Sequence, residues 1–197
     1  MYRAALIFVL LLFMALLLGT RFYPQVNRIE VIGNQHYDKA TVLARSGVQL
    51  GSPLLWVTRW QFSALARDPW IARIRVIRHF PDTLSIHVWE REPFVVAGDT
   101  VYAFDGTILP DVADTEALIQ LQGWGEARTQ EALDILRLLA DYEPKMLNYS
   151  PSGFDIDFDD QTLFTPDLHA IKTHWAGFVS QQGRAVAVYP WGVSVQP

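Results

Sequence analysis

The stretch that decides the fold spans residues 71–90 and reads IARIRVIRHFPDTLSIHVWE. On both sides of residues 80–83, apolar and polar side chains alternate with the period of two that a half-buried strand requires. Pro81 and Asp82 favour a turn between the two halves. The pattern predicts two strands joined by a tight turn, and their apolar face consists of Ala72, Ile74, Val76, Leu84, Ile86 and Val88.

Two elements are predicted at the start of this unit. Ile29 and Val31 alternate with polar neighbours and stop at Gly33-Asn34, which indicates a short strand followed by a turn. Residues 38–46 are rich in helix-forming side chains and end at Gly47, a typical residue just after a helix.

A second helix is expected between that first helix and the strand pair. Thr58 and Gln61 have the spacing of a capping box, in which each side chain bonds the backbone of the other residue. Phe62 and Leu65 share one face of the helix, which ends before Asp68-Pro69. The predicted order is β-α-α-β-β, a small sheet with two helices on its apolar face.

The N-terminal segment is strongly apolar. Residues 4–20 carry no charge, and their length reaches the lower end of what spans a bilayer. We expect a transmembrane helix at residues 4–23 and a cytoplasmic tail at 1–3. The alternative is a cleaved signal peptide, but the small-residue cleavage pattern is absent, since the run ends Leu17-Leu18-Gly19-Thr20. The short head predicts a type II orientation, with the bulk of the chain outside the cytoplasm.

The charge changes sign along the chain. Residues 24–94 carry nine positive and six negative side chains, whereas residues 95–197 carry five positive and fifteen negative ones. This change predicts a boundary between a domain at 26–94 and a second domain at 95–197. The sequence has no cysteine, which excludes disulfides, thiolate metal sites and cysteine nucleophiles.

The second domain is expected to be mixed and β-rich, with two helices. A hairpin is predicted around Asp105-Gly106, a helix at 129–142 and an alternating strand at 154–158. Thr165-Pro166-Asp167 is typical of a helix start, with Thr165 as the N-cap. The last predicted segment is a strand or strand pair at 185–195.

Several motifs in the first unit resemble the POTRA domain of the FtsQ/DivIB cell-division family. They occur in the same order and with similar spacing over residues 26–94. The overall class is therefore expected to be α+β: one transmembrane helix, a β-α-α-β-β POTRA domain and a β domain. The motifs are Ile29-Glu30-Val31-Ile32-Gly33-Asn34, Asp68-Pro69-Trp70-Ile71, Arg78-His79-Phe80-Pro81-Asp82-Thr83-Leu84 and Glu90-Arg91-Glu92-Pro93.

The resemblance implies a non-enzymatic scaffold in the cell (inner) membrane that links division proteins on its envelope side at the septum. It implies small coiled-coil partners similar to FtsB and FtsL, with no nucleic acid and no small-molecule substrate. Their contacts are expected on the last strand, at Tyr189, Trp191, Gly192, Val193, Ser194 and Val195. A terminal edge strand offers unpaired backbone groups to an incoming strand. Alternatively, both aromatic rings cover the core of the domain.

No catalytic, cofactor-binding or metal-binding residue is predicted. The acidic run 155–160 alternates with apolar residues, so it is interpreted as the exposed face of a strand, with a divalent-ion site as the alternative. Arg73, Arg75 and Arg78 are expected to form a basic face near the membrane, able to attract anionic lipid, unless they are simply a solvated sheet face.

Two other functions remain open from the sequence. A POTRA-bearing envelope chaperone or secretion accessory would bind nascent strands through the first unit. A periplasmic hydrolase would use the acidic segment around Asp157.

Overall fold

The computed structural model describes residues 2–20, 24–181 and 184–195, except for the side chains of residues 2–4. The chain divides into two compact units, Met1–Arg91 and Glu92–Pro197. Residue 1 of the expected cytoplasmic tail and residues 21–23 of the expected transmembrane segment lie outside the described residues.

Helix α1 (Tyr2–Gly19) forms where the apolar run predicts a helix. Its large apolar side chains from Leu6 to Leu18 are exposed. Judged on length and apolar character together, none of the helices in the described ranges suffices to cross a membrane. The predicted transmembrane helix is therefore not confirmed and stays a prediction.

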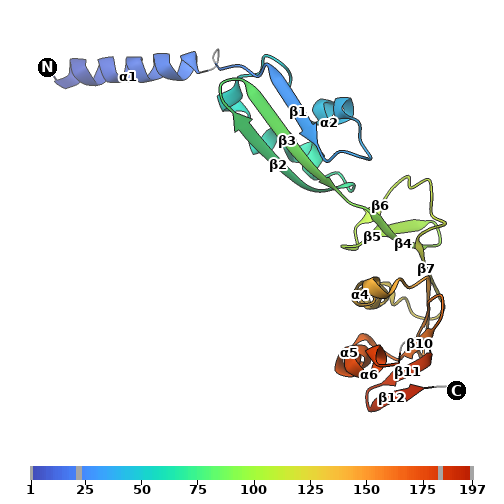
Figure 1. Cartoon of the computed structure of the whole chain (residues 1–197). Helices are drawn as coiled ribbons and strands as arrows, with labels where there is room; N and C mark the ends of the chain where they lie inside the picture. The colour runs from blue at the N-terminus through green and yellow to red at the C-terminus, as the bar shows by residue number, and fades with distance from the viewer. Residues whose placement is uncertain (1, 21–23, 182–183, 196–197) are drawn as a thin grey trace. The chain divides into compact units, whose positions relative to one another are not determined.

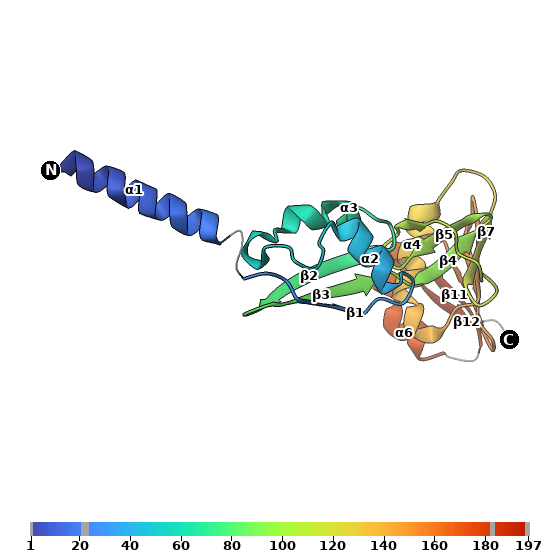
Figure 2. The ribbon, with the colours of Figure 1, turned by 90° about the horizontal axis from the view of Figure 1, so that it is seen from above.

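The first unit contains a three-stranded sheet in the order β1-β3-β2. Strand β1 (Arg28–Ile32) runs parallel to β3 (Thr83–Glu90), and β2 (Ile71–His79) runs antiparallel to β3. Helices α2 (Lys39–Ser46) and α3 (Ser63–Ala66) lie on one face of the sheet (Figure 2). The core between them contains Val42, Leu54, Phe62, Leu65, Leu84 and Ile86.

The local signals in this unit act as predicted at α2 and β1. Asp38 caps α2 by accepting a hydrogen bond from the Thr41 backbone N–H at 2.8 Å, and Gly47 ends the helix at a φ of +66°. Gly33 follows β1 at a φ of +85°, where a Cβ atom would come within 2.3 Å of the Val88 carbonyl oxygen. Only glycine fits that position without moving the backbone.

The second predicted helix differs in form. Thr58 and Gln61 make the expected capping box, but the helix begins as the 3₁₀ turn η2 (Arg59–Phe62) before the single α-helical turn α3. A further 3₁₀ turn, η1 (Leu54–Trp56), precedes it. On β2, Ala72 does not share the apolar face as predicted, because the register shifts between Ile71 and Arg73 and leaves it exposed.

The described part of the second unit is built on one nine-stranded sheet, in the order β12-β11-β10-β9-β8-β7-β4-β5-β6 (Figure 1). The pairs β4–β7, β7–β8 and β10–β11 are parallel and the others antiparallel. Its strands are β4 (Pro93–Ala97), β5 (Thr100–Ala103), β6 (Ile108–Leu109), β7 (Ile119–Gly123), β8 (Met146–Ser150), β9 (Gly153–Asp157), β10 (Thr162–Thr165), β11 (Ala185–Tyr189) and β12 (Gly192–Val195).

The helices of this unit bury their apolar side chains against the sheet. They are α4 (Thr129–Leu138), the 3₁₀ turn η3 (Ala140–Tyr142), α5 (Leu168–Thr173) and α6 (Trp175–Val179). Figure 1 shows α4, α5 and α6 along the same side of the strands. The common core includes Leu133, Leu136, Phe154, Ile156, Ile171 and Phe178.

Two predicted boundaries in this region differ from the structure. The chain divides into its two units between Arg91 and Glu92 rather than after residue 94, because Pro93–Ala97 already forms β4 of the second sheet. Thr165 is not a helix N-cap, because it is buried in β10 opposite Phe154. Asp167 caps α5 instead, and its carboxylate accepts a hydrogen bond from the Ala170 N–H at 2.7 Å.

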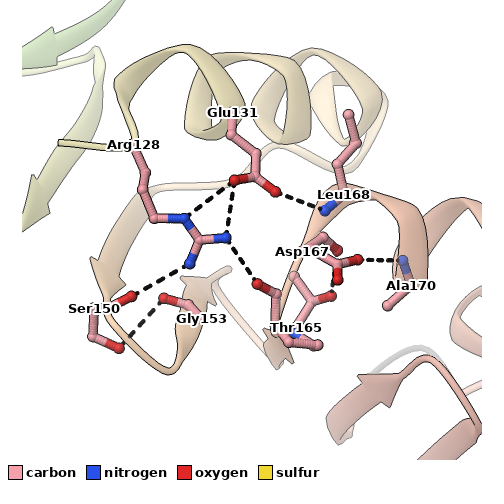
Figure 3. Close-up of polar contacts among 9 residues, drawn as sticks. Arg128, Glu131, Ser150, Gly153, Thr165, Asp167, Leu168 and Ala170 are labelled. Atoms are coloured by element: carbon pink, nitrogen blue, oxygen red, sulfur yellow. Dashed lines mark hydrogen bonds and ion pairs between the residues drawn. The ribbon is translucent and has the colours of Figure 1, made fainter. Parts of the chain in front are cut away.

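Arg128, just before α4, connects three parts of this unit (Figure 3). Its guanidinium donates to Glu131 Oε2 at 2.9 and 3.1 Å, to the Pro166 carbonyl at 2.9 Å and to the Ser150 carbonyl at 3.4 Å. Glu131 Oε1 in turn accepts the N–H of Leu168, the first residue of α5, at 3.2 Å. The pair therefore joins α4 to the β8–β9 turn and to the start of α5.

Replacing Arg128 by alanine should destabilise the second unit by about 2–4 kcal/mol, because it leaves a partly buried carboxylate and two carbonyl groups without their donor. Thermal and denaturant unfolding measure the change. Lys145→Ala is the matched control, since its ion pair with Asp159 is 3.5 Å long and exposed, and it should cost less than about 0.5 kcal/mol. Equal effects of the two substitutions would contradict the role assigned to Arg128.

Candidate functional site

The last two strands form a hairpin at one end of the second sheet. Strands β11 and β12 pair antiparallel from Tyr189–Gly192 to Val186–Val195, and residues 190–191 make the turn. In the described part of the chain, β12 pairs with β11 alone. Because antiparallel bonding alternates, every second residue of β12 directs its N–H and C=O away from β11. The hairpin therefore presents an open strand edge.

Three aromatic rings lie near this hairpin, and two of them stack. Tyr189 and Trp191 lie with ring centroids 5.0 Å apart and planes 7° apart, and Phe164 of β10 lies 5.6 Å from Tyr189. Tyr189 is half-buried, whereas Trp191 is 80% exposed. Tyr189 thus belongs in part to the domain surface, but Trp191 does not cover the core. This exposure argues against the alternative in which both rings are only structural.

The two short helices hold the hairpin in place. Gly177 of α6 lies so close to β12 that a Cβ atom on it would be 2.6 Å from Val193 Cγ2. His174, at the junction of α5 and α6, has its Nε2 3.1 Å from the carbonyl oxygen of Pro190 in the turn. One face of β12 is therefore packed, while its outer edge and Ser194 stay exposed.

The structure brings the predicted site residues of the last strand into one hairpin, but Val193 faces the side packed against α6. These residues are Tyr189, Trp191, Gly192, Val193, Ser194 and Val195. Gly192 has a φ of +155°, which side chains rarely allow. Sequence reasoning missed Phe164, because β10 was not predicted as a strand. Its Leu163-Phe164 pair within a short polar segment was the available signal.

The predicted basic face is divided between the two sides of the POTRA-like sheet. Arg73 lies opposite Trp89, with its guanidinium carbon 5.1 Å from the ring centroid, and Arg75 lies opposite His87. Arg78 pairs with the buried Leu84 and donates a hydrogen bond to the Val57 carbonyl on the helix side. The structure groups Arg73 with Arg75 and places Arg78 apart from both.

Asp155 and Asp157 of the acidic run lie on β9, as interpreted, whereas Asp159 and Asp160 follow the end of the strand. Phe154 and Ile156 are buried while Asp155 is exposed. Among the described residues, no group of three or more His, Cys, Asp or Glu side chains is arranged to hold a metal ion. The pKa of Asp155 is raised above its ordinary value of 3.8. Partial desolvation is the larger cause, and repulsion from the Asp157 carboxylate is the smaller one.

The raised pKa of Asp155 predicts a pH-dependent stability effect. Because the folded state binds this proton more tightly than the unfolded state, stability falls as the pH rises from the ordinary pKa through the raised one. Asp155→Asn should therefore raise the melting temperature slightly at pH 7 and have no such effect near pH 3. Melting curves at both pH values test this, and equal stabilisation at both would exclude the charge as the cause.

The packing of β12 against α6 predicts a coupled pair. Gly177→Ala should loosen β12, because the new methyl group meets Val193 Cγ2. Adding Val193→Ala removes the Cγ2 methyl group at position 193 and with it the clash. The double variant should therefore be more stable than the sum of the two single changes predicts. Hydrogen exchange of the β12 amides and a double-mutant cycle measure the coupling; strict additivity would contradict the contact.

The comparisons with known proteins agree with this architecture. The family model described as "POTRA domain, FtsQ-type" matches residues 25–91, which cover the β1–β3 unit. The chain is similar to proteins named cell division protein FtsQ. One from Syntrophotalea carbinolica is 28% identical over 158 residues, covering 73% of this chain and 56% of that protein. One from Xanthomonas campestris is 32% identical over 97 residues, covering 48% of this chain and 32% of that protein.

A third relative, cell division protein FtsQ of Geobacter sp., is 34% identical over 88 residues, covering 40% of this chain and 32% of that protein. The matched part of the chain thus spans about half or less of each of these relatives. Residues 25–91 are an FtsQ-type POTRA domain, and the similarity to several FtsQ cell division proteins supports the place of this chain in the FtsQ/DivIB family.

Proposed function

We propose that this chain is a non-enzymatic cell-division scaffold that links division proteins on the envelope side of the septum. The open edge of β12 beside the exposed Trp191 is the observation that carries the proposal. An edge strand binds an incoming strand through backbone hydrogen bonds, and neighbouring rings provide the buried area that dominates binding energy. The relatives are named cell division protein FtsQ, which supports cell division as the process that this binding serves.

The partners that fit this surface are small membrane-anchored coiled-coil proteins similar to FtsB and FtsL. Such a partner would add a strand beside Val193 and Val195 and cover Trp191. The Tyr189 ring stacks on the Trp191 ring, with ring planes only 7° apart, and so holds its orientation. A ring that is already oriented loses less conformational freedom on binding than a free one, so the stacked pair favours this surface as the anchor.

The same proposal includes the membrane. The uncharged run at residues 4–20 supports a single-pass, type II anchor in the cell (inner) membrane, with both folded units outside the cytoplasm. Support comes from the sequence of this run and from the apolar side chains that surround α1 on all sides, a pattern that a solvated surface helix does not show.

Trp191→Ala should weaken binding of the coiled-coil partners at least roughly thirtyfold, as expected for the loss of an interface anchor, and leave the melting temperature unchanged. Trp124→Ala is the matched control, because Trp124 is also exposed, at 66%, but lies in the β7–α4 loop. Titration calorimetry or co-purification of the full chain measures binding. Normal binding by the Trp191 variant would contradict the proposed interface.

A fluorescently tagged copy should gather in a band at midcell in dividing cells, because a septal scaffold is recruited by its partners. The Trp191→Ala variant tests whether its own partners still arrive there. A uniform envelope signal of the unmodified chain would reject the division role and favour the chaperone or secretion alternative, which a screen against unfolded outer-membrane strands then tests directly.

A further inference from the structure

The exposed large apolar side chains of the POTRA unit gather at one end. We name as the proximal patch the five residues Leu50, Leu55, Trp56, Trp60 and Phe80, which are between 42% and 75% exposed. Single exposed apolar residues are ordinary, but a contiguous group marks a binding surface. The remaining large exposed apolar residues of the described POTRA unit, Ile32 and Trp89, lie towards the opposite end of the sheet.

Backbone hydrogen bonds place the patch where the chain enters the POTRA unit. Leu54, next to Leu55 and Trp56, donates its N–H to the Pro24 carbonyl at 2.9 Å. Gly51, next to Leu50, donates to the Val26 carbonyl at 2.8 Å. The segment that carries Leu50, Leu55 and Trp56 therefore runs beside the first residues of the unit.

The β2–β3 turn completes the patch. Asn27 donates its N–H to the carbonyl of Asp82 at 2.8 Å, two residues after Phe80. Arg78, just before Phe80, reaches the Val57 carbonyl close to Trp60. Five chain steps separate Pro24 from Gly19 at the end of α1, so the two are within about 18 Å even in a fully extended chain. The patch thus lies at the end of the unit where the chain enters it from α1.

Positive charge accompanies the aromatic rings. Arg28, Arg59 and Arg78 are exposed around the patch, and the Arg59 guanidinium lies 5.8 Å from the Trp60 ring centroid. Tryptophan prefers the boundary between water and lipid, because its ring is apolar and its N–H is polar, and phenylalanine adds apolar area. Arginine beside them matches the negative headgroups of anionic lipids.

We propose that the proximal patch lies against the surface of an anionic lipid bilayer and seats the POTRA unit on the membrane. The inference rests on the proposed anchoring by α1. The lipid contact is then made by the proximal patch. It is not made by Arg73 and Arg75, which lie on the sheet face opposite the helices.

A flat surface fits the patch better than a bound peptide does. A groove of about 580 Å³ opens between η2–α3 and β2, but Trp60 alone among the patch residues lines it. A peptide in that groove would leave Leu50, Leu55 and Phe80 exposed to water. A bilayer surface can touch side chains on several separate segments at once, and the patch is spread over four: the turn at Leu50, η1, η2 and the β2–β3 turn.

The absence of cysteine makes the test direct, because a single introduced cysteine is the only label site. We would reconstitute the full chain into vesicles of phosphatidylcholine and phosphatidylglycerol with an environment-sensitive dye at Leu11→Cys, Leu50→Cys or Trp89→Cys. Brominated acyl chains should quench the dye strongly at position 11, clearly at position 50 and weakly at position 89. The emission at position 50 should also shift to shorter wavelength.

Substitutions separate docking from mere tethering. With the dye at position 50, Trp60→Ser and Phe80→Ser together should abolish quenching, whereas the matched pair Ile32→Ser and Trp89→Ser should leave it unchanged. Arg59→Gln should lower the ratio of docked to undocked molecules about fivefold on anionic vesicles and have little effect on neutral ones. Melting curves confirm that each variant is folded.

The outcomes distinguish the inference from the anchoring proposal. Quenching at position 11 without quenching at position 50 would overturn the patch and leave the anchor intact. No quenching at position 11 would overturn the anchor and the patch with it. Quenching at position 50 that survives Trp60→Ser and Phe80→Ser would mean that the tether alone holds the unit near lipid, which also rejects the patch.

Discussion

The bonds of Arg128 hold the second unit in its observed arrangement. Three elements that are distant in sequence, the start of α4, the β8–β9 turn and the start of α5, meet at one guanidinium group. Stacking of the same group 4.1 Å from the Phe154 ring centroid connects it to the hydrophobic core. Because Glu131 carries this contact on to the first N–H of α5, the position of α5 depends on an ion pair made at α4.

The position of α5 decides where the candidate binding edge lies. Helix α5 continues through His174 into α6, and these two short helices touch the last hairpin at Pro190 and Val193. Arg128 is thus connected to β12 through a series of contacts, although it does not touch the candidate site itself. The candidate binding edge and these contacts belong to one unit with one core, whereas the POTRA unit has a core of its own.

The features that could be predicted from the sequence are those made by residues close together in it. The Thr58–Gln61 capping box, the Gly33 turn and the hairpin at Asp105-Gly106 all form as expected. Arg128 could not be assigned, because its carbonyl partners are 22 and 38 residues away. Thr165 was misassigned, since a strand end and a helix cap both favour a threonine before proline. The last hairpin was predicted, but its neighbour Phe164 was missed because parallel pairing joins β10 and β11 across a helical segment.

The two ends of the second sheet are unequal within the described residues. Strand β6 has two residues, whereas β12 has four. An edge of two residues offers few backbone groups to another strand, which disfavours stacking of copies end to end with β12 of one against β6 of the next. The longer edge at β12 is the end of the sheet better suited to extension by a further strand.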